Sequence, residues 1–328
     1  MVWLEFSIEA SAELAPVLED FLLEQGAQAV TLQDLTNQAI FEPELGTTPL
    51  WTLNKVTGLF DDELDAQYLF SEMKKSFGKD APQNFLLQAL EDRDWQREWL
   101  KYYQAMCFGK RLWIIPSEEL LAKNRNPVEI KSGQIVLAMD PGLAFGTGTH
   151  ETTALCLEWL AEHDLTGKKL VDFGCGSGIL GIAASLLGCA SVWATDIDPQ
   201  AILASKENAQ RNHVYSKMHI VDIETFEKQK HQQTFDIVVA NILAGPLQKL
   251  SSELANLLAS GGIIVLSGIL VKQAEELARC YQPCFDNIEL TYKNDWTRLV
   301  ARKKQPVKNK PQLHFIYVKP ATKRKSYE

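Results

Sequence analysis

A glycine-rich segment that joins a strand-like run to a helical run restricts the fold of this chain more than any other feature. It reads Asp-Phe-Gly-Cys-Gly-Ser-Gly from Asp172 to Gly178 and follows the apolar residues Leu170 and Val171. The next segment, 179–187, is apolar and helical in character. Glycine lets a backbone turn sharply and approach a ligand closely, and a following helix N-terminus offers free N–H donors. The segment therefore predicts a ligand-binding turn in a parallel α/β sheet.

Two carboxylates narrow the choice of ligand. Asp196 ends the next strand-like run, at the distance of about 20 residues that suits an acid gripping a ribose diol. Asp172 stands beside the glycines, where it would repel the pyrophosphate of a dinucleotide but would suit a cofactor with an ammonium and a sulfonium group. We therefore predict S-adenosylmethionine as the cofactor. The predicted contacts are Asp172, Gly174, Gly176, Gly178 and Asp196.

Strand-like and helical runs alternate over residues 169–281, which predicts a mostly parallel sheet with helices on both faces. Two closely spaced strand-like runs, 285–293 and 297–302, predict an antiparallel hairpin at one edge. We expect a seven-stranded, Rossmann-like class I methyltransferase domain over residues 107–303. The strands of its sheet are predicted at 169–173, 191–196, 218–222, 235–240 and 262–267 and in this hairpin, and two further short strands are predicted at 112–115 and 135–139. Its helices are predicted at 152–162, 178–188, 199–212, 246–258 and 271–281.

The first 92 residues predict a separate, small α+β domain. Its order of elements, β-α-β-β-α-β, is that of a ferredoxin-like domain, and it holds no catalytic constellation, so we expect it to recognise the substrate. Its strands are predicted at 2–8, 28–33, 51–60 and 84–90, with helices at 13–25 and 62–77.

The segments around the predicted methyltransferase domain have their own character. Residues 93–106 predict a connecting helix, in which Trp95, Trp99 and Tyr103 are spaced by four and share one stripe. The alternative is a helix that packs on the surface and does not act as a hinge between the two domains. Residues 304–328, rich in Lys and Pro, predict a basic, flexible tail.

The net charge of −9 is unevenly distributed over the 328 residues. Residues 1–93 hold 17 acidic and 5 basic side chains, whereas residues 303–328 hold 8 basic and 1 acidic. An acidic front would repel nucleic acid and attract a basic protein, although acidic faces also serve solubility alone. The six cysteines lack metal-ligand spacing, so we expect no metal site and no disulfide framework. With no membrane-length apolar run and no secretory signal, a cytoplasmic protein is expected.

Asn241 is the candidate catalytic residue. It follows the buried strand 235–240, whose carboxyl end is expected to open onto the cofactor crevice. An amide there can accept a hydrogen bond from an incoming amine and aim the amine lone pair at the methyl carbon. Because the transfer is an in-line displacement, alignment and desolvation should supply most of the rate. The alternative role for Asn241 is a turn or helix cap before Pro246.

Three further polar residues have both a structural and a functional interpretation. Asp198, followed by Pro199, is interpreted as a helix N-cap. Asp222 could reach the adenine amino group or cap a turn. His150, in a loop rich in Gly and Thr, could act as a base, but a cap or packing role is the preferred interpretation.

Four motifs stand out together: Asp94, Trp95, Trp99, Tyr102 and Tyr103 in the connector, and the segments 140–150, 172–180 and 241–247. Through these motifs, residues 1 to about 303 of the chain resemble the ribosomal protein L11 methyltransferase family (PrmA). The resemblance implies methylation of lysine and N-terminal amines on a basic protein of the large ribosomal subunit. It also implies cofactor contacts at Thr153, Gly174, Asp196 and Asn241.

The chain departs from the family in residues 304–328, which add lysines and an apolar run at 313–318. The lysines could contact ribosomal RNA, or the segment could be a simple appendage. An RNA or glutamine N-methyltransferase is weakened because Leu243 and Ala244 occupy positions where many such enzymes carry Pro and Tyr. A non-catalytic assembly factor is weakened by the intact loop and acids. A nicotinamide dehydrogenase is disfavoured by Asp172 and by the glycine spacing.

Overall fold

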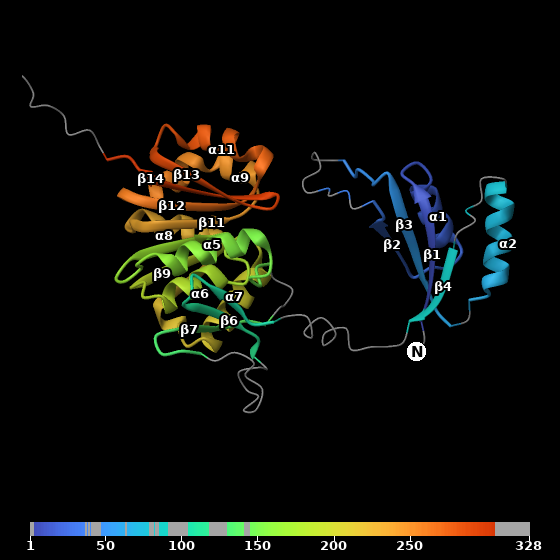
Figure 1. The fold of residues 1–328 in the computed structure, drawn as a ribbon, viewed down its shortest axis with the longest axis horizontal. Coiled ribbons are helices and arrows are strands. Elements are labelled where there is room, and N and C mark those ends of the chain that lie inside the picture. Colours follow the sequence, from blue (N-terminus) through green and yellow to red (C-terminus); the bar gives the residue numbers. More distant parts are fainter. Residues whose placement is uncertain are drawn as a thin grey trace, which may run out of the picture. The chain divides into compact units, whose positions relative to one another are not determined.

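The computed structural model describes residues 3–36, 38, 40, 47–62, 64–78, 82, 85–90, 104–117, 130–140 and 145–305. The chain divides into two compact units, Met1–Trp99 and Leu100–Glu328, and each is described by itself (Figure 1).

The first unit contains a four-stranded antiparallel sheet with the strand order β2-β3-β1-β4. Helix α2 begins at Ala66 rather than at the predicted residue 62, because the Asp65 carboxylate accepts hydrogen bonds from the N–H groups of Gln67 and Tyr68 and caps the helix there. The core contains Phe6 of β1 and Leu18 of α1. The elements are β1 (Trp3–Ser11), α1 (Ala15–Glu24), β2 (Ala29–Asp34), β3 (Leu53–Phe60), α2 (Ala66–Phe77) and β4 (Phe85–Leu90).

The second unit is built around a seven-stranded sheet with the order β10-β9-β8-β11-β12-β14-β13. The chain runs from β8 outward through β9 to β10, and then returns to the other side of β8 with β11, so the strand order reverses between β8 and β11. In open α/β sheets, ligands bind at the carboxyl ends of the strands beside such a reversal. The strands are β8 (Lys169–Phe173), β9 (Ser191–Asp196), β10 (Met218–Asp222), β11 (Phe235–Asn241), β12 (Leu258–Leu270), β13 (Phe285–Lys293) and β14 (Trp296–Lys303).

Successive residues of the central strands pack on opposite faces of this sheet. Leu170 and Val239 belong to one core cluster, whereas Val171 and Val238 belong to the other. Both faces are therefore covered by helices, which agrees with the mostly buried residues of β8 and β11. The longer helices are α5 (Glu151–Glu162), α6 (Ile179–Leu186), α7 (Pro199–Arg211) and α11 (Ala274–Tyr281). No helix in the described part of the chain is long and apolar enough to cross a membrane.

Two details of the second unit differ from the sequence-based expectation. Helix α8 (Ile223–Gln229) lies between β10 and β11, where no helix is predicted, and its Phe226 is buried against Phe173 and Trp193. The single helix predicted at 246–258 is instead two helices, α9 (Ala244–Lys249) and α10 (Ser251–Leu257), which are followed directly by β12.

The segment before α5 forms a small sheet of its own. Strands β5 (Met106–Phe108), β6 (Leu112–Ile115) and β7 (Ile135–Ala138) pair in that order, and none of them joins the seven-stranded sheet. Met106, predicted as the last residue of the connecting helix, is thus the first residue of β5. The predicted helical stripe with Trp95, Trp99 and Tyr103 lies outside the described residues, as does the tail from residue 306.

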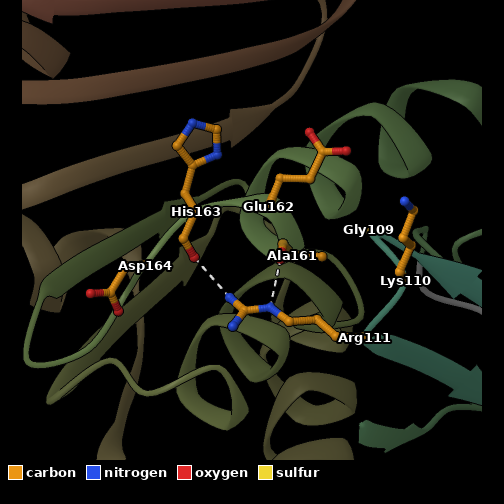
Figure 2. Close-up of a pocket in the computed structure, with 7 residues that line it drawn as sticks. All are labelled: Gly109, Lys110, Arg111, Ala161, Glu162, His163 and Asp164. Atoms are coloured by element: carbon orange, nitrogen blue, oxygen red, sulfur yellow. Dashed lines mark hydrogen bonds between the residues drawn. The ribbon is translucent and has the colours of Figure 1, made fainter. Parts of the chain in front are cut away.

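Arg111 attaches the small sheet to the end of α5. Its Nε donates to the Ala161 carbonyl at 2.6 Å and its Nη2 to the His163 carbonyl at 2.8 Å, beside a surface cavity of about 560 Å³ (Figure 2). These carbonyls lie at the C-terminal end of a helix, where a cation is favourable. Arg111 therefore caps α5 and fixes the helix that reaches the candidate site at its other end.

Candidate active site

A cavity of about 360 Å³ lies at the carboxyl ends of β8, β9 and β11. Register places the three strand ends together, since Asp172 of β8 is opposite Val239 of β11 and Phe173 is opposite Thr195 of β9. The residues that line it are Phe145, His150, Thr152, Gly174, Gly176, Asp196, Asn241, Ile242, Leu243, Gly268 and Trp296. Of the predicted site residues, four line this cavity: Gly174, Gly176, Asp196 and Asn241.

The first two glycines of the loop, Gly174 and Gly176, have backbone conformations and close contacts that only glycine permits. Gly174 has φ +75° and Gly176 has φ +54°. A Cβ on Gly174 would collide with the Cγ2 of Ile242, and one on Gly176 would lie 2.5 Å from the Phe145 carbonyl oxygen. The absence of these side chains is what lets Ile242 and the Phe145 carbonyl approach the loop backbone so closely.

We expect Gly174→Ala to weaken both the fold and ligand binding. The left-handed backbone costs an L-residue roughly 1–2 kcal/mol, and the added methyl would push Ile242 into the cavity that it lines. Urea unfolding and calorimetric titration with S-adenosylmethionine would measure the two losses. Gly245→Ala is the matched control, because a Cβ there meets no atom within 4 Å, and it should leave both quantities nearly unchanged. Equal behaviour of the two variants would contradict the prediction.

Asp196 faces the cavity with its carboxylate held by backbone donors. Its Oδ2 accepts from the Gly176 N–H at 2.9 Å, and its Oδ1 accepts from the Asp198 N–H at 3.0 Å. Each oxygen keeps further lone pairs. The carboxylate is thus oriented by the glycine loop and can accept hydrogen bonds from a ligand diol.

Asp172 does not line the cavity, which differs from the predicted contact with the cofactor. The side chain is fully buried behind the loop, and its Oδ2 accepts from the Gly181 N–H in α6 at 2.8 Å, while its Oδ1 has no partner. Burial raises the pKa of Asp172 to about 7, with the nearby Asp196 charge contributing in the same direction and the Gly181 hydrogen bond opposing it. Asp172 therefore joins β8 to α6 from beneath the loop.

Gly178 also lies outside the cavity lining. It precedes the first residue of α6 with φ +79°, and a Cβ there would lie 2.8 Å from the Ser205 hydroxyl of α7. Its role in the structure is the close packing of the loop against α7.

The raised pKa of Asp172 predicts a pH-dependent stability. Between its ordinary value of 3.8 and about 7, the folded chain holds a proton that the unfolded chain has lost. The free energy of unfolding therefore falls by about 4 kcal/mol as the pH rises through this window. Asp172→Asn keeps an oxygen for Gly181 and removes the ionisation.

Urea unfolding of Asp172→Asn and of the wild type at several pH values between 4 and 8 would measure this effect. The stability of the variant relative to the wild type should increase with pH and level off above about pH 7. A difference that does not change with pH would contradict the assignment of this group.

Asn241 is the last residue of β11, and only the nitrogen of its side-chain amide makes a hydrogen bond. Its Nδ2 donates to the Thr153 hydroxyl at 3.2 Å, and its Oδ1 is buried without a partner. Thr153 is fully buried and does not line the cavity. Thr153, implied by the family resemblance as a cofactor contact, therefore contacts Asn241 and orients its free oxygen.

The other polar candidates act as helix caps. His150 is the N-cap of α5, with its Nδ1 at 3.3 Å from the Thr152 N–H, so the preferred interpretation is confirmed, although the ring also lines the cavity. Asp198 caps α7 through the Gln200 N–H at 2.8 Å. Asp222 caps α8 through the Thr225 N–H at 2.8 Å, so the structure shows the cap, while the contact with adenine stays a prediction.

Sequence reasoning missed the aromatic side of the cavity. The Phe145 and His150 rings lie edge-on at 5.6 Å, and the His150 and Trp296 rings at 4.9 Å. Trp296 is the first residue of β14, and no local pattern marks it as a site residue. Within the described ranges no group of three or more His, Cys, Asp or Glu is arranged to hold a metal ion.

Comparison with known proteins gives one family. The model of ribosomal protein L11 methyltransferase (PrmA) matches residues 2–304. A protein named ribosomal protein L11 methyltransferase from Pseudomonas savastanoi pv. phaseolicola is 45% identical over 304 residues, covering 93% of this chain and 100% of that protein. One of the same name from Azotobacter vinelandii is 45% identical over 299 residues, covering 91% and 98%.

A solved structure agrees with the sequence relatives. The ribosomal protein L11 methylase from Lactobacillus delbrueckii subsp. bulgaricus has a TM-score of 0.54 and 31% identity, and the match covers 62% of this chain and 100% of that one. The α/β methyltransferase-like fold is thereby confirmed. The chain belongs to the ribosomal protein L11 methyltransferase (PrmA) family.

Proposed function

We propose that this chain transfers methyl groups from S-adenosylmethionine to lysine side chains and to the N-terminal α-amine of ribosomal protein L11. The observation that carries the proposal is the buried, unpartnered Asn241 Oδ1 in the same cavity as the glycine loop and Asp196. A buried acceptor without a partner is costly, so a polar ligand group is the natural partner for it. Because its substrate is a ribosomal protein, we place the enzyme in the cytoplasm.

The lining of the cavity fits S-adenosylmethionine. Gly174 and Gly176 line the cavity and carry no side chain, so a ligand can lie against their backbone. The Asp196 carboxylate, oriented by two backbone N–H groups, would accept the ribose hydroxyls. When bound, the cofactor supplies an electrophilic methyl group on a sulfonium. Gly178 and Asp172 would support this binding from behind the loop.

Asn241 would orient the acceptor amine. Its free Oδ1 accepts an N–H of the amine, while Thr153 prevents the amide from rotating. A neutral amine is required for attack, which an α-amine with a pKa near 7.7–8 provides more readily than a lysine near 10.4. The apolar side chains of Ile242 and Leu243 line the cavity beside Asn241, and an apolar surrounding favours the neutral form of a lysine.

We propose that the first unit is ferredoxin-like and binds the protein substrate. The support is its order of elements, its strand order β2-β3-β1-β4 and its excess of acidic residues, which suits a basic partner. The connecting helix over residues 93–106 stays a prediction. So does a contact of residues 304–328 with ribosomal RNA, since the family match ends at residue 304.

A chain shortened to residues 104–328 tests this division of labour. We expect it to bind S-adenosylmethionine with unchanged affinity, because every residue that lines the cavity lies in the second unit. Its kcat/KM for the protein substrate should fall at least 100-fold when the docking surface is gone. Calorimetry and a methyl-transfer assay would measure the two quantities. Normal methylation by the shortened chain would refute the role of the first unit.

The proposed reaction has a direct test. The full chain is incubated with methyl-labelled S-adenosylmethionine and total ribosomal proteins, and the labelled band is identified by mass spectrometry. The expected result is label in L11, on lysine and N-terminal amines. Label in RNA alone, or in a different protein, would overturn the proposal.

A further inference from the structure

One side of the cavity is formed by aromatic and apolar side chains that the proposed cofactor contacts do not use. Phe145, His150 and Trp296 line it in an edge-to-face series, with ring centroids 5.6 Å and 4.9 Å apart. Leu243, next but one to Asn241, lines the same cavity and is 52% exposed. This face therefore offers apolar surface to a second ligand beside the free oxygen of Asn241.

The position of Trp296 is fixed by contacts between its hairpin and α5. On one side of it, Lys293 Nζ lies 3.0 Å from Glu158 Oε1, and Asn294 Nδ2 donates to a Glu151 oxygen at 3.1 Å. On the other side, Arg298 Nη1 donates to the Leu155 carbonyl at 2.6 Å. These three contacts fix the hairpin, and with it the backbone of Trp296, against α5.

The same helix positions the catalytic amide. Thr153, which binds the Asn241 Nδ2, is in the first turn of α5, and His150, which contacts the Trp296 ring, is its N-cap. The spacing between the Asn241 oxygen and the Trp296 indole is thus set by one rigid element. When Asn241 holds an amine, the substrate atoms attached to that amine must therefore lie along the aromatic surface of Phe145, His150 and Trp296.

We propose that Trp296, supported edge-on by His150, is the specificity residue that favours lysine side chains as acceptors, by packing its indole against the methylene chain that leads to the amine. The inference rests on the proposed function and adds a residue to it. A lysine stem is apolar and packs well on an aromatic surface. An N-terminal α-amine has no such stem, so it gains nothing from this contact.

Because L11 carries both lysine side chains and an N-terminal α-amine, the methylation of one type of amine serves as the control for the other. With Trp296→Ala, we expect kcat/KM for lysine methylation of L11 to fall tenfold or more, since several buried methylene groups lose their contact. Methylation of the α-amine on the same protein should change by less than threefold. Mass spectrometry of L11 after short incubations gives both rates, and hence their ratio, in one experiment.

Matched variants separate this role from a structural one. Trp296→Phe keeps an aromatic surface and should restore most of the lysine preference. Tyr292→Ala removes an exposed aromatic ring of the same hairpin that does not line the cavity, and it should leave the ratio unchanged. The affinity for S-adenosylmethionine, measured by calorimetry, should be the same in all variants.

The outcomes are distinct. A lysine to α-amine ratio that falls in Trp296→Ala and recovers in Trp296→Phe supports the proposal. Equal losses for both amines, or no loss for either, overturn it. If the wild-type chain methylates neither amine of L11, the proposed function itself fails, and that result is visible before any variant is made.

Discussion

Asp196→Ala is expected to lower the affinity for S-adenosylmethionine by on the order of 100-fold or more while leaving the fold intact. The carboxylate is held toward the cavity by the Gly176 and Asp198 N–H groups, so it is oriented before a ligand arrives. A hydrogen bond to a charged group contributes about 1.5–3 kcal/mol, and a ribose diol offers two. Isothermal titration calorimetry measures the affinity, and urea unfolding checks the fold.

The adjacent carboxylate provides the control for this experiment. Asp198→Ala removes the cap of α7 but keeps the backbone N–H that orients Asp196. It should cost some stability, about 1 kcal/mol for a lost N-cap, and leave the affinity for S-adenosylmethionine nearly unchanged. Equal affinity in Asp196→Ala and the wild type would remove the ribose contact from the proposed site.

Asn241→Ala is expected to lower kcat roughly 100-fold while changing the affinity for S-adenosylmethionine far less. The alanine leaves the amine without the acceptor that aligns it, and in-line transfer depends steeply on alignment. Single-turnover kinetics with L11 would measure the chemical step, and calorimetry would measure binding of the cofactor. Turnover equal to that of the wild type would exclude Asn241 from catalysis.

Thr153→Val tests how the amide is oriented. The valine keeps the shape of the buried side chain and removes the hydroxyl that accepts from Asn241 Nδ2. We expect a fall in kcat in the same direction as for Asn241→Ala but smaller, because the amide is still present and only its orientation is lost. A larger effect than that of Asn241→Ala would show that Thr153 acts on the cofactor directly.

The elements of the second unit could largely be predicted, because their signals are local. The strand that precedes the glycine loop, the loop itself and the hairpin at the sheet edge all occur where the sequence predicts them. Helix α8 was outside the reach of this reasoning because its seven residues contain too few apolar positions to establish a period. Its stability comes from packing Phe226 against aromatic residues of two strands.

The sequence by itself determined most of the strands and helices and the positions of the glycine loop, Asp196 and Asn241, while the family was indicated by resemblance. It could do so because periodicity, glycine placement and strand-end acids are properties of short segments. The tertiary structure alone decided that Asp172 binds the backbone of α6, that Thr153 holds an amide 88 residues away, and that Trp296 completes the cavity. Such contacts join segments far apart in the chain, and only the packing of the folded elements brings them together.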